Sequence, residues 1–188
     1  MQILLVVALC AFVARISAAT PPQPLYTLIT SKEYGLNLTR DIETGEVGFQ
    51  SGSFSRHWID VPVSQGVKNW HCFRSSAQKE LQRSTWWIRF ENYISGQAAT
   101  TYSRGGNYYA YHPSLFEIEK VGDTYYIVSL EPSDPNRRLA WTIENNSTTS
   151  ENFLLKLRPY SRSSSQKFTI TQEPGDPIDM LSNLPPVA

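Results

Sequence analysis

Hydrophobic and polar positions alternate along short segments of this chain, most clearly between Leu115 and Ile143. Apolar residues recur there at every second position, which is the spacing of a strand with one buried face. Gly122-Asp123 supplies a turn after the first strand, and Pro132 to Asn136 forms the loop before the third, because proline cannot donate to a sheet. Three such strands make only half a layer, so they need partners elsewhere in the chain.

The same alternation predicts the partner strands. They are expected at residues 25–30, 35–39, 47–49, 57–61, 68–73, 85–90, 108–111, 153–157 and 167–171. In the 85–90 segment Trp86, Ile88 and Phe90 share the inward face, so Trp87 and Arg89 should point outward. Only residues 75–83 have a helical composition, over about two turns. About eleven or twelve short strands separated by turns predict an all-β sandwich or barrel.

Weak internal repetition favours one of these architectures. An aromatic residue stands just before an isoleucine at Trp87, Phe116 and Phe168, with spacings of 29 and 52 residues. Three repeats of four strands predict a β-trefoil with a shortened middle repeat, in which residues 115–143 are one complete repeat. The unequal spacing leaves a β-sandwich as the alternative.

The first residues predict a secreted, extracellular protein. An apolar run from Ile3 to Ala14 is followed by small residues, the pattern of a signal peptide over residues 1–19. The run is shorter than the roughly 20 residues of a membrane span, and no later segment is apolar enough for one. We expect residues 20–172 to form a single domain and the proline-rich residues 173–188 to form a tail.

Charge and cysteine usage limit the possible partners. Of 17 basic and 17 acidic residues, Arg15 leaves with the signal peptide, so the mature chain has 16 basic residues and a net charge of −1, which argues against nucleic-acid binding. Cys72 is then the single cysteine, either a buried thiol or half of an intermolecular disulfide. Sequons predict N-glycosylation at Asn37 and at one of Asn145 and Asn146.

Motifs for catalysis are missing from the sequence. It contains no G-x-S-x-G elbow and no H-E-x-x-H motif. The histidines His57, His71 and His112 are not spaced as metal ligands. We therefore expect no enzymatic activity, no cofactor and no metal. A small hydrolase is the third possibility, after a ligand-binding protein and a structural or immune-interaction protein.

Ligand binding is the stronger prediction, because outward aromatic residues beside polar groups can cover and hydrogen-bond a sugar. The candidate ligand-binding residues are Trp87, Arg89, Tyr109, Tyr111, Asp123 and Tyr125. Packing in the core is the alternative role for the aromatic members. Arg137, Arg138 and Arg158 could form a basic patch for sulfated glycans, with an ordinary solvated face as the alternative.

The run from Phe116 through Thr124-Tyr125-Tyr126-Ile127 to Leu139-Ala140 resembles the strand pattern of ricin-B-like β-trefoils and of the trefoil head of bacterial binary insecticidal toxins. A secreted, tryptophan-rich chain of this size is also similar to the Trp-rich salivary proteins of blood-feeding mosquitoes. Ricin-type repeats end in Gln-x-Trp, whereas this chain has Gln-x-Phe once, at Gln166 and Phe168.

The first resemblance implies a monomeric binding protein for a glycan or a host macromolecule. The salivary resemblance implies a modulator of haemostasis or inflammation. The alternative is a secreted β-sandwich protein with a structural or immune-interaction role and no small ligand.

Overall fold

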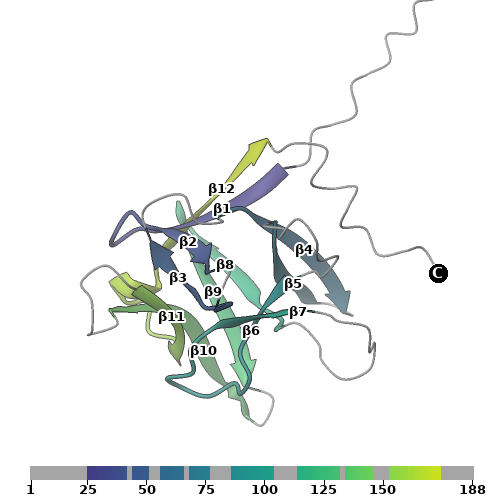
Figure 1. Ribbon diagram of the computed structural model, residues 1–188. Coiled ribbons are helices and arrows are strands. Elements are labelled where there is room, and N and C mark those ends of the chain that lie inside the picture. Colours follow the sequence, from purple (N-terminus) through teal and green to yellow (C-terminus); the bar gives the residue numbers. More distant parts are fainter. Residues whose placement is uncertain are drawn as a thin grey trace, which may run out of the picture.

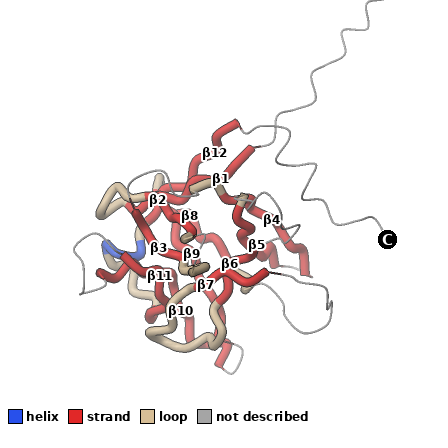
Figure 2. The backbone as a smooth tube through the Cα atoms, viewed as in Figure 1, coloured by secondary structure: helices blue, strands red, loops and turns tan. Residues whose placement is uncertain are grey.

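The computed structural model describes residues 25–41, 44–50, 56–65, 68–76, 86–103, 114–131, 134–145 and 153–174. Within them lie twelve strands and one short 3-10 helix (Figures 1 and 2). The elements are β1 (Leu25–Ser31), β2 (Asn37–Arg40), β3 (Val47–Gln50), β4 (Trp58–Gln65), β5 (Lys68–Ser75), β6 (Trp86–Arg89), β7 (Thr100–Ser103), β8 (Glu117–Val121), β9 (Thr124–Glu131), β10 (Asp134–Asn145), β11 (Phe153–Pro159), η1 (Ser164–Gln166) and β12 (Phe168–Pro174). None of the helices in this part of the chain has the length and apolarity to span a membrane.

Six strands close into a barrel. β1 pairs with β12 along its whole length, beginning with Leu25 opposite Pro174, and the two lie side by side in Figure 1. β4 pairs with β5, and β8 with β9, as antiparallel hairpins. Shorter contacts join β1 to β4 and β9 to β12, while β5 meets β8 through two 2.8 Å backbone hydrogen bonds between His71 and Phe116. Each barrel strand therefore has a neighbour on both sides.

The other six strands form three hairpins that cap the barrel: β2–β3, β6–β7 and β10–β11. Backbone bridges connect the first hairpin to the third, with Phe49 opposite Phe153, and to the second, with Glu46 opposite Thr100. A further bridge, at Ala98, connects the second hairpin to the third. Each third of the chain thus supplies a barrel strand, a hairpin and a second barrel strand, which is the β-trefoil expected from the sequence.

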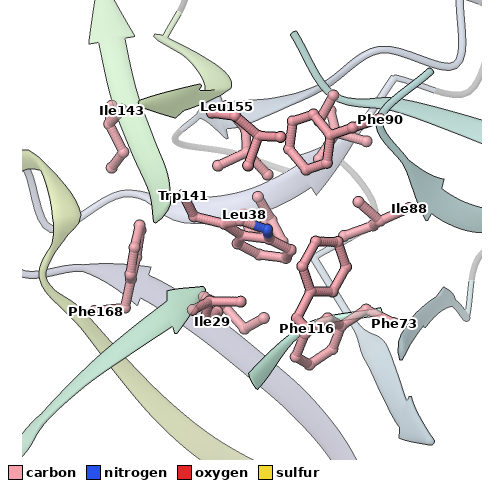
Figure 3. Packing of buried hydrophobic residues seen from close by; sticks show 14 of the residues in the cluster. Ile29, Leu38, Phe73, Ile88, Phe90, Phe116, Trp141, Ile143, Leu155 and Phe168 are labelled. Atoms are coloured by element: carbon pink, nitrogen blue, oxygen red, sulfur yellow. The ribbon is translucent and has the colours of Figure 1, made fainter. Parts of the chain in front are cut away.

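The hydrophobic core fills the barrel and the space under the hairpins. Each repeat contributes one fully buried aromatic residue at the start of its fourth strand: Trp58, Phe116 and Phe168, all 0% exposed. Trp141 lies beside two of them, its ring 5.0 Å from that of Phe116 and 6.4 Å from that of Phe168 (Figure 3). Burying one such side chain contributes about 1.5–3 kcal/mol, so this three-fold aromatic cluster is a main source of stability for a chain whose described residues hold one free cysteine.

The repeat boundaries differ from those expected. The residue that corresponds to Phe116 and Phe168 is Trp58, because Trp87 lies in the hairpin strand β6. The repeats cover residues 25–65, 68–121 and 124–174, so the middle one is the longest and is not shortened. The stretch from Leu115 to Ile143 therefore joins the last strand of the second repeat to the first two of the third, and it is not one repeat.

The bounds of three elements also differ. β10 begins at Asp134, inside the expected loop, and continues beyond Ile143 to Asn145. Ser75 ends β5 and does not start a helix. Pairing with neighbouring strands sets these bounds. The local composition of a segment contains no information on that pairing, so the bounds differ from those expected. β12 includes Glu173 and Pro174, the first two residues of the expected tail.

Some expectations fall outside the described residues. These are the signal peptide at 1–19, most of the helix at 75–83, the strand at 108–111 with Tyr109 and Tyr111, and Asn146 and the tail beyond residue 174.

Candidate functional site

A small polar pocket lies on the outer face of the first hairpin. It has a volume of about 50 Å³ and is lined by Thr39, Asp41, Glu46, Gly48, Gln50, Phe153 and Leu154. Leu38 and Phe49 point the opposite way and are fully buried in the core. The alternation of side chains along β2 and β3 thus directs one set of residues into the core and the other into the pocket.

Two features of the chain shape this pocket. Gly48 lies opposite Leu154, and a Cβ atom at Gly48 would stand only 2.5 Å from the carbonyl oxygen of Phe153. Only glycine lets β11 approach β3 this closely. At the end of the hairpin, the Asp41 carboxylate accepts a 2.9 Å hydrogen bond from the Thr44 amide, and the Asp41 amide donates to the Glu46 carbonyl at 2.9 Å. The tight turn places Asp41 beside Glu46.

An aromatic pair lies at the start of β11. The rings of Tyr34 and Phe153 are 4.5 Å apart and inclined at 36°. Phe153 lies opposite Phe49, so its ring is on the core side of the sheet, and its backbone carbonyl is the part that approaches Gly48 at the pocket. Tyr34 is 41% exposed and packs on the Phe153 ring, so the aromatic pair is on the other face of β11 from the side chains that line the recess.

The polar lining consists largely of hydrogen-bond acceptors. Asp41 and Glu46 contribute carboxylates and Gln50 contributes an amide, while the Thr39 hydroxyl donates to the Gly48 carbonyl at 3.3 Å. Pockets that enclose a small molecule usually exceed about 300 Å³. A ligand must therefore lie on the surface, with one or two donor groups in the recess.

Trp87 and Arg89 alternate with the fully buried Ile88 on β6, which places them on the outer face of the second hairpin, although Trp86, expected on the inward face, is also only half-buried. Both are half-buried, and the Arg74 guanidinium lies 5.8 Å from the Trp87 ring. Each of β2 and β6 is the first hairpin strand of its repeat. The face of β6 that carries Trp87 and Arg89 therefore corresponds to the face of β2 that carries Thr39. The structure brings Trp87 and Arg89 together, but on a different repeat from the pocket.

Asp123 and Tyr125 lie at the β8–β9 hairpin, away from both hairpin faces. The Asp123 carboxylate forms a 2.8 Å ion pair with Lys32. Hydrogen bonding by Lys32, followed by its charge, lowers the pKa of Asp123. Lys120 lies 5.3 Å from the Tyr125 ring. Both predicted residues thus have a lysine neighbour.

The three arginines of the expected basic patch lie in different surroundings. Arg137 is exposed. Arg138 contacts Glu119 at 3.1 Å, whereas Arg158 forms two hydrogen bonds with Glu144. These bonds from Arg158 are the main cause that lowers the pKa of Glu144 to about 2. Arg138 and Arg158 therefore belong to separate ion-pair clusters.

The remaining predicted positions are a thiol and two sequon asparagines. Cys72 is buried, its thiol donates to the Val61 carbonyl at 3.6 Å, and desolvation raises its pKa to about 11. It is thus a protonated buried thiol at neutral pH, which is unsuited to nucleophilic attack. Asn37 is half-buried on β2 and Asn145 is exposed at the end of β10. The described residues contain no group of three or more potential metal-ligating side chains.

No family model and no curated protein matches this chain. Among solved structures, the designed three-fold symmetric protein ThreeFoil matches with a TM-score of 0.52 and 17% identity, over 77% of this chain and 96% of that one. A mosquitocidal holotoxin matches with a TM-score of 0.53 and 19% identity over 80% of this chain, which spans only 17% of the holotoxin. The C-terminal domain of an earthworm lectin, a mutant in complex with 6'-sialyllactose, matches with a TM-score of 0.47 and 13% identity, over 80% of this chain and 100% of that one.

The two matches with TM-scores above 0.5 confirm the β-trefoil fold, and one of them is to a toxin active against insects, as the sequence resemblance led us to expect.

Proposed function

We propose that this chain is a secreted, non-enzymatic binding protein that recognises a glycan through the pocket of its first repeat. The observation that carries the proposal is the convergence of Asp41, Glu46 and Gln50 on one recess of the first hairpin. Carboxylates and amides accept hydrogen bonds from sugar hydroxyls.

The dimensions of the site support the same ligand class. A recess of about 50 Å³ admits a hydroxyl or hydroxymethyl group and not a whole sugar ring. Binding therefore depends on the donor groups of the sugar that enter the recess. The signal-peptide pattern at residues 1–19 supports secretion as part of this proposal.

A host macromolecule is the second candidate ligand, supported by a cluster on the third repeat. The Arg138 guanidinium lies 4.6 Å from the Tyr160 ring, and Arg162 donates a 2.9 Å hydrogen bond to the Tyr160 hydroxyl. Tyrosine and arginine are enriched at the energetic centres of protein interfaces. A salivary modulator of haemostasis or inflammation would use such a surface.

A glycan array followed by calorimetry with the best ligand tests the proposal. Asp41→Asn and Glu46→Gln each weaken a hydrogen bond to the ligand, and Gln50→Ala removes an amide from the lining. We expect each to reduce affinity about tenfold, equivalent to about 1.4 kcal/mol. Glu173→Gln is the matched control, because this carboxylate lies on β12, where its ion-pair partners are His57 at 3.5 Å and Arg56 at 3.8 Å.

Two results would contradict the proposed site. An array without signal removes the glycan-binding function. Loss of binding in Trp87→Ala and Arg89→Ala, with full binding in the three pocket variants, moves the ligand to the second repeat.

A further inference from the structure

The sequon Asn37-Leu38-Thr39 contributes one residue, Thr39, to the lining of the pocket. Asn37 lies opposite Gln50 and Thr39 lies opposite Gly48 in the β2–β3 ladder. Leu38 between them is fully buried in the core, so the side chains of Asn37 and Thr39 are on the outer face with the pocket. The acceptor asparagine is thus paired with one lining residue, Gln50, and stands two register positions from the Thr39–Gly48 pair.

The orientation of the Asn37 amide is set by the neighbouring strand. Its Oδ1 atom accepts a 2.8 Å hydrogen bond from the Thr30 hydroxyl on β1. The oxygen and nitrogen of an amide diverge, so Nδ2 points away from β1, to the side of β3 where Gln50 lines the pocket. A substituent on Nδ2 therefore leaves the surface next to Gln50.

We propose that an N-linked glycan on Asn37 covers this pocket, so that the glycosylated chain is a closed form and the unmodified chain an open form of the binding protein. This inference rests on the proposed function. In the modification, Asn37 Nδ2 forms a bond to C1 of the first sugar of a lipid-linked oligosaccharide diphosphate. The bond between C1 and the diphosphate oxygen breaks, the lipid diphosphate leaves, and the amide loses one proton.

Burial of Thr39 determines when the glycan can be attached. Thr39 is 2% exposed, and its hydroxyl donates to the Gly48 carbonyl. The sequon hydroxyl is therefore inaccessible once β2 has paired with β3, and attachment must precede folding of this hairpin. The choice between the open and closed forms is then made once, during synthesis.

The glycan attached to Asn37 competes with a free glycan for the pocket. An attached glycan stays at high effective concentration beside the pocket, and its first residue occupies the approach to Gln50. A free glycan must displace it at every encounter. Affinity for a free ligand should fall without any change in the fold.

The test compares the full chain made in a eukaryotic secretory line with the same chain made unmodified in a bacterial cytosol. Peptide mass spectrometry measures occupancy at Asn37, and the glycan array with calorimetry measures binding. We expect at least tenfold weaker binding by the secreted chain. Asn37→Gln made in the secretory line should bind like the unmodified chain, whereas Ser147→Ala with Thr148→Ala, which removes the other two sequons, should still bind weakly.

The outcomes separate the two proposals. Equal binding by the Asn37-glycosylated and unmodified chains overturns the inference and leaves the glycan-binding function intact. An unoccupied Asn37 in the secreted chain also overturns it. Absence of binding by the unmodified chain refutes the glycan-binding function itself, and the inference with it.

Discussion

Replacing Gln166 by Met should destabilise the protein by about 2–4 kcal/mol. Gln166 is 1% exposed, and its Oε1 atom accepts hydrogen bonds from the amides of Ser161 and Arg162 at 2.9 and 3.0 Å. Its Nε2 atom donates to the Thr142 hydroxyl at 3.0 Å and to the Pro159 carbonyl at 2.9 Å. One side chain thus connects the loop before β12 to Thr142 on β10 and to Pro159 at the end of β11.

The magnitude follows from these four bonds, each contributing about 1 kcal/mol net. Ser161 and Arg162 are exposed, so water can replace the side chain at their amides, and the lower limit of about 2 kcal/mol counts only the bonds to Thr142 and Pro159. Arg162 adopts a left-handed backbone with φ of 58°, a conformation that costs about 1–2 kcal/mol. In the variant Arg162 is free to leave this conformation. The strain released in this way also keeps the loss of stability below the sum of the four hydrogen bonds.

Urea denaturation monitored by tryptophan fluorescence measures the change, and the midpoint of thermal unfolding should fall by roughly 4–16 °C. Amide exchange at Ser161 and Arg162 should accelerate in the variant. Gln172→Met is the matched control, because Gln172 is exposed on β12 and should change stability by less than about 0.5 kcal/mol. A loss below about 1 kcal/mol in Gln166→Met, with unchanged amide protection, would refute this account of the loop.

Two further predictions concern ionisable groups. The folded-state pKa of Glu144 is lowered from 4.5 to about 2, so its contribution to stability is present above pH 4.5 and is lost as the pH falls through 2. Glu144→Gln should remove that contribution, and unfolding of both proteins between pH 7 and 2 should show their stabilities converging at the acid end. The Cys72 thiol, with a pKa of about 11, is ionised in roughly one molecule in a thousand at pH 8. A thiol reagent should therefore label the protein rapidly only in denaturing urea, and rapid labelling of the native chain would contradict its burial.

The strands could be predicted because their side-chain alternation is local. Leu139, Trp141 and Ile143 alternate with polar or small residues, and all three are buried in the core. The repeat pattern was harder to find, because only the third repeat has a glutamine two residues before its aromatic, at Gln166 and Phe168. The first repeat has Arg56 before Trp58 and the second has Ser114 before Phe116.

Different connections in the three repeats hid the same pattern. The connection from β7 to β8 is longer than those from β3 to β4 and from β11 to β12. Loops outside the barrel tolerate such insertions at little cost in stability, so equivalent residues are unevenly spaced along the chain.

The pocket could not be predicted from the sequence, because it joins residues about one hundred positions apart. Asp41 and Glu46 look like ordinary solvated turn residues, and nothing local places Phe153 beside them. One signal was present. Gly48 lies between Val47 and Phe49 in a strand, and a glycine inside a strand often marks the close approach of another backbone.

The pairing of β1 with β12 joins the two ends of the described chain. Leu25 lies opposite Pro174, so the first and last strands are neighbours although they belong to different repeats. A short linker between these two positions would make the chain circular without moving a barrel strand. New ends could then be opened at the exposed turn around Gly122, where β8 and β9 are already held by their own ladder. The barrel therefore does not depend on the order in which the three repeats follow one another along the chain.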